Sequence, residues 1–197
     1  MSNEPTRREA ATAGHTGDVA TSRRALDSHD PAVRATGLGA LARLGVLTDG
    51  DVATALRDHS AAVRRRAAEV AARRPGADLL PLLHDDDPTV VEVAAWAVGE
   101  HESDSKEIVG RLVELAGIHD DPLVRESAVA ALGAIGADAG RTAILAALDD
   151  KPAVRRRAVL ALAPYEGADV DAAIGKALHD RDWQVRQAAE DLRRAMR

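Results

Sequence analysis

Arginine, aspartate and histidine recur at regular places in this sequence of 197 residues, and a chemical site would be built from these side chains. Arginine offers a rigid fork of donors that grips a carboxylate or a phosphate with two hydrogen bonds. A ligand site rarely needs the same residue in every repeat of a chain. We therefore predict a structural ladder, in which each recurring arginine pairs with an aspartate of an adjacent turn. Five arginines each directly follow a valine at corresponding places: Arg34, Arg64, Arg125, Arg155 and Arg186.

Histidines recur at the ends of predicted helices, often beside an aspartate. Histidine and carboxylate ligands could together hold a metal ion. Packed helices, however, lie roughly 10 Å apart, so histidines of successive repeats are too far apart to share one ion. A histidine at a helix C-terminus is favourable in itself, because it can bond the last carbonyls. The sequence therefore predicts no metal site. The histidines are His29, His59, His84, His119 and His179.

Catalytic groups are scarce. The chain has no cysteine, which excludes disulfides, thiolate metal ligands and cysteine nucleophiles. The acidic run at 85–87 lacks the glycine and the further ligands of a calcium-binding loop. No serine or threonine stands in a nucleophile–base pattern, and no glycine-rich phosphate loop follows a strand. We predict a protein that is not an enzyme and has no cofactor.

These side chains are positioned by a helix whose beginning and end can be read from the sequence. In the clearest copy, Asp121 is an N-cap and Pro122 occupies the first helical position, where its missing N–H costs nothing. Apolar residues follow from Val124 at helical spacing, and Gly136 ends the helix. The pattern recurs at six valine anchors, which lie 30, 27, 34, 30 and 31 residues apart: Val33, Val63, Val90, Val124, Val154 and Val185.

A shorter apolar segment precedes each anchored helix and predicts a first helix for every repeat. The expected first helices cover residues 17–28, 49–58, 77–83, 105–118, 138–148 and 168–178. Two-helix repeats of this length stack into an α-solenoid, in which each repeat buries its apolar face against its neighbours. The sequence therefore predicts an all-α fold, an α-solenoid of about six helix pairs. We expect one solenoid domain at residues 17–197, after a disordered or partly helical tail at 1–16.

The composition agrees with thin, regular helix packing. Hydrophobic residues make up 46% of the chain but include no phenylalanine, so alanine, valine and leucine must build the core. The net charge of −6 disfavours non-specific attraction to nucleic acid or to an anionic membrane. No segment reaches the roughly 20 apolar residues of a membrane span. We expect a cytoplasmic protein with no membrane partner, and the sequence leaves its oligomeric state open.

The anchored helices resemble a known family. Residues 118–136 nearly match the pattern D-x-x-x-V-R-x-x-A-x-x-A-L-G-x-[IL]-G of the short HEAT-like repeats named after phycobilisome lyases, and the likeness covers about 17–197. The resemblance implies HEAT-like helix pairs and relatives that include scaffolds, adaptors and a few enzymes. Related deoxyhypusine hydroxylases bind iron through repeated His-Glu pairs, but here only His101-Glu102 occurs, and it follows its helix. A role in bilin attachment is implied by the family name alone.

A binding surface is predicted from the positions that vary between repeats. In HEAT-type solenoids the second helices usually line the concave side, and there the positions two, three, six and ten after the anchor face outward. Two arginine patches would then flank an acidic strip around a solvent-facing tryptophan, and exposed tryptophan and arginine are enriched at binding hot spots. By the same count Val93 and Leu160 face outward, whereas Trp183 is expected to pack on the end of the stack. The predicted binding residues are Arg65, Arg66, Glu69, Arg73, Glu92, Trp96, Glu100, Glu126, Arg156 and Arg157.

The favoured function is a non-enzymatic scaffold or adaptor that holds a protein or peptide segment in the concave groove. Its partner would carry acidic residues for the arginines and an apolar or cationic group for Trp96. The alternative is nucleic-acid binding of the kind found in HEAT-like alkylpurine DNA glycosylases, with Trp96 stacking on a base. A nucleic-acid site needs a continuous basic stripe. Four glutamates interrupt such a stripe and disfavour nucleic acid as a partner: Glu69, Glu92, Glu100 and Glu126.

Overall fold

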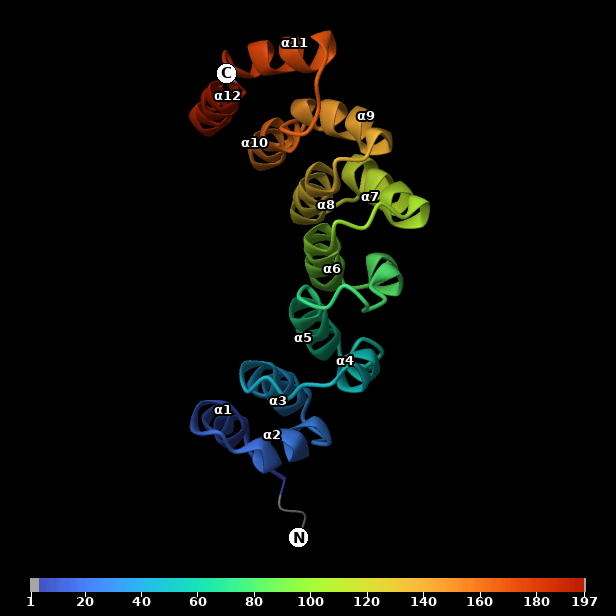
Figure 1. The fold of residues 1–197 in the computed structure, drawn as a ribbon, viewed down its shortest axis with the longest axis vertical. Helices are drawn as coiled ribbons and strands as arrows, with labels where there is room; N and C mark the ends of the chain where they lie inside the picture. Colours follow the sequence, from blue (N-terminus) through green and yellow to red (C-terminus); the bar gives the residue numbers. More distant parts are fainter. Residues whose placement is uncertain (1–3, 197) are drawn as a thin grey trace. The chain divides into compact units, whose positions relative to one another are not determined.

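The computed structural model describes residues 4–196, and across these residues the fold is all-α, with no strand (Figure 1). This confirms the predicted fold class. The residues pack into two compact units, Met1–Ala97 (unit 1) and Val98–Arg197 (unit 2), and helix α6 (Pro88–His101) contributes residues to both. In the described part of the chain, no helix is both long enough and apolar enough to cross a membrane.

Unit 1 begins with a helix where the sequence predicts a disordered or partly helical tail. Helix α1 packs against α2 and α3, and Ala10 on α1 is fully buried. A Cβ atom built on Gly14 would lie 2.8 Å from the Cα of Ala40, so the missing side chain lets α1 approach α3 closely. Besides α6, the helices of unit 1 are α1 (Arg7–Thr16), α2 (Val19–Leu26), α3 (Pro31–Arg43), α4 (Asp49–Ala55), α5 (Ala61–Ala71) and the 3₁₀ helix η1 (Leu80–His84).

Unit 2 is a regular series of helix pairs. Helix α8 packs between α7 and α10, and α10 packs on α12. A Cβ atom on Gly133 would lie 2.5 Å from the Cβ of Ala161, so glycine is what allows α8 and α10 to lie this close. The helices of unit 2 that follow α6 are α7 (Lys106–Ile118), α8 (Pro122–Ile135), α9 (Asp138–Ala146), the 3₁₀ helix η2 (Ala147–Asp149), α10 (Pro152–Ala161), α11 (Ala168–Ala177) and α12 (Trp183–Ala195).

Helix α8 has the predicted caps, and the anchor valines of all second helices are buried. In α8 the Asp121 carboxylate accepts a hydrogen bond of 2.9 Å from the backbone N–H of Leu123, Pro122 occupies the first turn, and Gly136 ends the helix in the left-handed region at φ 67°. The anchor valines are at most 4% exposed, so each one lies in the core: Val33, Val63, Val90, Val124, Val154 and Val185.

The first helices follow the prediction with one exception. Residues 77–83 are expected to form an α-helix, but the segment instead runs as a turn and an irregular stretch into η1. Pro75, Gly76 and Pro81 account for this, because a proline lacks the N–H of the helical ladder and glycine is costly to order. The third repeat therefore lacks an α-helical first helix.

Candidate functional site

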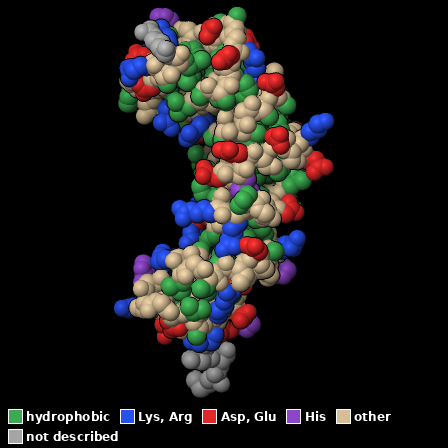
Figure 2. All heavy atoms as spheres, viewed as in Figure 1, with side chains coloured by type: hydrophobic (Ala, Val, Ile, Leu, Met, Phe, Trp, Pro, Cys, Tyr) green, Lys and Arg blue, Asp and Glu red, His purple; other side chains and the backbone are tan. Residues whose placement is uncertain are grey.

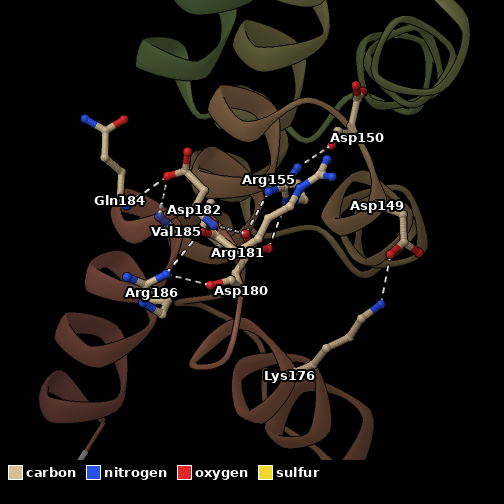
Figure 3. Close-up of polar contacts among 10 residues, drawn as sticks. All are labelled: Asp149, Asp150, Arg155, Lys176, Asp180, Arg181, Asp182, Gln184, Val185 and Arg186. Atoms are coloured by element: carbon tan, nitrogen blue, oxygen red, sulfur yellow. Dashed lines mark hydrogen bonds and ion pairs between the residues drawn. The ribbon is translucent and has the colours of Figure 1, made fainter.

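Arg155 joins two repeats of unit 2 by a set of hydrogen bonds to their turns, which we call a rung (Figure 3). Arg155 of α10 donates from Nε and Nη2 to the two carboxylate oxygens of Asp180, at 2.9 and 2.7 Å. Its Nη1 donates to the carbonyl oxygen of Asp150, at 2.8 Å. The Arg155 side chain is only 6% exposed. The guanidinium thus holds the turn before its own helix and the turn of the following repeat.

The same rung occurs twice in each unit, and we call the set the arginine ladder. In every rung an arginine that follows an anchor valine forks onto the aspartate at the end of the next first helix. This confirms the predicted ladder for four of the five arginines. Arg186 also bonds the carbonyls of its own turn, at 2.8 and 3.2 Å, but no carboxylate of the described residues lies within ion-pair distance of it. The four rungs are Arg34–Asp58, Arg64–Asp85, Arg125–Asp150 and Arg155–Asp180.

Each rung keeps its carboxylate charged. Hydrogen bonds from the arginine lower the pKa values of Asp85, Asp150 and Asp180 below the ordinary range of aspartate, against the smaller opposing effect of burial. One oxygen of each carboxylate also accepts a backbone N–H of the turn that follows. The donors of each guanidinium and the oxygens of its carboxylate are thus bonded to each other. The ladder therefore has a structural role and leaves few groups that could bind a ligand.

The histidines form no metal site in the part of the chain that is described, since no group of three or more histidine, cysteine, aspartate or glutamate residues is arranged to hold an ion there. His119 instead accepts a hydrogen bond of 3.1 Å at Nδ1 from the backbone N–H of Asp121. It therefore supports the turn that begins α8.

Three of the predicted binding residues of unit 1, Arg65, Arg66 and Glu69, form a charged cluster on α5. Glu69 contacts Arg65 at 3.2 Å and Arg66 at 2.6 Å, so a single carboxylate serves two guanidiniums. The Arg66 guanidinium lies against α3 at Gly39, where a Cβ atom would come within 2.1 Å of Nη2. Gly39 stands six positions after its anchor and is buried, and it is not among the binding residues predicted from the sequence. Arg73, one further turn along, is exposed.

The tryptophan of α6 lies at the surface of unit 1. Trp96 is 44% exposed, and Glu92 one turn before it is half-buried. Glu100, on the part of α6 that belongs to unit 2, is exposed. Val93 is only 7% exposed, so its predicted outward position is wrong. Helix α6 is apolar around most of its circumference, and such a helix is buried on nearly every side.

In unit 2 the structure brings three predicted residues together. Oε1 of Glu126 on α8 lies 3.9 Å from Arg156 and 3.5 Å from Arg157, both on α10. These contacts are longer than the 2.6–2.7 Å ion pairs of the ladder. Nε of Arg157 is buried without a hydrogen-bond partner, and Leu160 one turn along α10 is 39% exposed. Two cations share one loosely held carboxylate beside an apolar side chain.

The face drawn in Figure 2 shows basic and acidic side chains interspersed, with no uniformly basic stripe. Trp183 is 64% exposed at the first position of α12, so the expectation that it packs on the end of the stack is wrong. Trp183 stands where four other repeats have a proline, and most of the residue is exposed to solvent.

Comparison with known proteins finds similarity to repeat proteins. Residues 76–163 match the family model of HEAT repeats. No curated protein matches the sequence. A crystal structure of an engineered protein is similar with a TM-score of 0.67 and 21% identity, over 89% of this chain and 96% of that one.

Two designed armadillo repeat proteins are similar in fold as well. One, computationally designed for modular peptide recognition, has a TM-score of 0.57 and 18% identity over 98% of this chain and 95% of that one. The other is a complex with the peptide (KR)4, with a TM-score of 0.51 and 17% identity over 98% of this chain and 88% of that one. The phycobilisome-lyase type of repeat stays a prediction. The chain is therefore an all-α repeat solenoid, and its residues 76–163 match the family model of HEAT repeats.

Proposed function

We propose that this protein is a non-enzymatic scaffold or adaptor that holds a segment of another protein against the exposed side chains of its second helices. The observation that carries the proposal is Trp96, a large aromatic ring that is 44% exposed in a chain with only two tryptophans. Tryptophan and arginine are the residues most enriched at binding hot spots. A partner side chain that covers the ring would remove apolar surface from water, which stabilises the complex.

The arginines beside these surfaces support an acidic partner. On α5 two guanidiniums share Glu69, and on α10 two share Glu126, so each cluster keeps an excess positive charge. A partner carboxylate would satisfy donors that the protein itself leaves free. Since Arg65 and Arg66 belong to unit 1 and Arg156 and Arg157 to unit 2, each unit offers a docking surface of its own.

The comparisons favour a peptide over other partners. The repeat-solenoid fold is typical of protein-binding scaffolds, because stacked repeats present long surfaces made of corresponding positions. The designed armadillo proteins of similar fold were made for, or bound to, peptides. We do not extend the proposal to nucleic acid, because Glu69 and Glu126 sit directly against the arginines that would have to contact phosphates.

The proposal is tested by selecting peptides from a random library on the purified protein and measuring affinities by isothermal titration calorimetry. We expect acidic peptides with at least one large apolar residue, and weaker binding at high salt because the arginines are screened. Trp96→Ala should reduce the affinity by roughly 1–2 kcal/mol, a usual hot-spot loss.

Trp183→Ala is the matched control, since it removes the other exposed tryptophan from the first position of α12. It should leave the affinity unchanged. Equal losses in the two variants, or no enrichment of acidic sequences, would refute the proposed surface. A Trp96→Ala protein that fails to fold would show that the ring belongs to the core.

A further inference from the structure

The irregular third repeat leaves one face of α4 without a packed helix. Asp49, Val52, Ala53, Leu56 and Arg57 follow one another at the spacing of a single helix face. In unit 2 the corresponding first helices, α7 and α9, pack against each other. Beside α4 the chain instead makes a turn at 74–77, closed by a hydrogen bond of 2.9 Å from the N–H of Ala77 to the carbonyl of Arg74.

A pocket of about 420 Å³ lies between this face of α4 and the turn. Its wall across from α4 is formed by Pro75, Ala77, Pro81 and Leu82, so most of the lining is apolar. Binding sites for small molecules are concave, mostly apolar and about 300–1,000 Å³ in volume, with a few polar groups that fix the ligand. The pocket lies wholly within unit 1 and has these properties.

The walls of the pocket are held in place. Arg74 forms an ion pair with Asp49 at the start of α4 and donates from Nη2 to the carbonyl of Leu47, at 2.6 Å. Leu79 and Leu83, on either side of the lining residue Leu82, are buried in the core. Both ends of the turn are therefore held in place, and the pocket is an ordered part of the repeat.

The polar side chains at the pocket differ in whether their charged groups already have partners within the protein. Asp49 is paired with Arg74, and Asp78 accepts a hydrogen bond of 3.3 Å from the N–H of Leu80. Arg57, just after α4, is exposed, and among the described residues its guanidinium makes one hydrogen bond, of 3.1 Å, to the carbonyl of Ala53 on α4. An arginine has five donor hydrogens. Most donors of Arg57 therefore face solvent without a protein acceptor, and a ligand acceptor could replace the water there.

We propose that this pocket binds a small amphipathic molecule that buries an apolar body between α4 and residues 75–82 and places a carboxylate on Arg57. This site is independent of the second-helix surfaces proposed above. The apolar body gains from leaving water, and the carboxylate satisfies the guanidinium with charge-assisted hydrogen bonds.

Octanoate is the test probe, titrated into ¹⁵N-labelled full-length protein while amide resonances are followed by NMR. We expect saturable shifts at Val52, Leu56 and Ala77, and at least roughly tenfold weaker binding of octanol, which lacks the charge. Arg57→Gln should remove most of the preference for octanoate over octanol. Arg181→Gln, a change at an exposed arginine of unit 2, should leave the preference intact.

Ala53→Phe is the blocking variant, because Ala53 lines the pocket from the exposed side of α4. It should abolish octanoate binding, while Ala146→Phe on α9 should not. Circular dichroism reports whether each variant is folded, and Arg57→Gln keeps the test decisive if Ala53→Phe is not. Shifts that do not saturate, equal binding of octanol, or unchanged binding in a folded Ala53→Phe protein would overturn the proposal.

Discussion

Arg155 and Arg156 are neighbours on α10 with the same side chain, yet they have different surroundings. Arg155 is 6% exposed and forks onto Asp180 at 2.7 and 2.9 Å. Arg156 is 39% exposed, and its nearest carboxylate oxygen, on Glu126, lies 3.9 Å away. One guanidinium is a fully bonded part of the repeat, and the other faces solvent with donors to spare.

The place of an arginine in the repeat decides whether its guanidinium is bonded within the protein or faces solvent. The position directly after the anchor points to the turn of the next repeat, and its aspartate partner recurs with it in all four rungs. The next position is buried in none of the repeats, and its residue differs between repeats. The comparison therefore separates residues that stabilise from residues that are free to bind.

Acidification should have the largest effect on the free energy of unfolding, because it acts on all four rungs at once. The folded pKa values of the ladder aspartates are lowered, so their contribution to stability is complete above the unfolded pKa of about 3.9 and is lost as the pH falls through the folded pKa. We expect the free energy of unfolding from urea titrations to be nearly constant from pH 7 to pH 5 and to fall steeply below.

The N-cap aspartates Asp18 and Asp87 have lowered pKa values too, so a variant without one rung isolates the contribution of the ladder. Arg155→Met combined with Asp180→Leu should show a shallower loss of stability at acid pH than the unchanged protein. Parallel pH profiles of stability for the two proteins would mean that the ladder does not cause the loss of stability at acid pH.

Removing a single ladder arginine should have the next largest effect on the free energy of unfolding. Arg155→Ala leaves the Asp180 carboxylate, which is 16% exposed, without its cation, and breaking such a pair costs roughly 3–5 kcal/mol. Arg156→Ala should change the free energy of unfolding by less than about 1 kcal/mol. Chemical denaturation measures both. Similar losses of unfolding free energy in the two variants would mean that Arg155 and Arg156 contribute equally to stability.

Replacing both members of the rung should restore most of that loss. Arg155→Met with Asp180→Leu removes the buried charges together, and such replacements are often neutral or stabilising. The turn still loses the 2.8 Å hydrogen bond from the N–H of Asp182 to Asp180, worth about 1 kcal/mol. We expect the double variant to unfold within about 2 kcal/mol of the unchanged protein. A double variant as unstable as Arg155→Ala would contradict this account.

Much of the fold follows from local chemistry that is visible in the sequence. Asp121, Pro122 and Gly136 mark the ends of α8 because each acts through its own backbone or within one turn. The ladder was predictable because its residues recur in register. Val93 was misplaced because a helix that is apolar on nearly all sides gives no periodicity from which its outward face can be read.

The remainder depends on contacts between distant residues. The hollow beside α4 exists because residues 73–79 fail to form a helix, and its volume depends on where Arg74 anchors the turn. The contact of Glu126 with Arg156 and Arg157 joins two repeats through side chains that do not recur. No pattern in a single sequence reports such a pairing.

A local cap should have a smaller effect than a rung. Asp121→Ala removes the 2.9 Å hydrogen bond to the N–H of Leu123 and should cost about 1 kcal/mol in thermal or urea unfolding. Peptide binding by the folded protein should be unchanged. If binding disappeared while stability stayed the same, the turns would form the binding surface and the second helices would not.

The smallest change in stability is expected at Glu126, the outward counterpart of the ladder aspartates. Its carboxylate makes only the long contacts of 3.5 and 3.9 Å, so Glu126→Gln should change the free energy of unfolding by no more than about 0.5 kcal/mol. Asp150→Asn is the matched ladder variant, and it should cost several times more because Asp150 holds the Arg125 fork at 2.6 and 2.7 Å.

Binding should respond in the opposite order. Glu126 competes with a partner carboxylate for Arg156 and Arg157, so removing its charge should strengthen binding of an acidic peptide, and the gain should shrink as salt is added. Asp150→Asn leaves those two arginines untouched and should not alter the affinity of the folded protein. If Glu126→Gln destabilised the protein as much as Asp150→Asn and left peptide affinity unchanged, Glu126 would be a structural residue, and the arginines of α10 would have no donors to offer a partner.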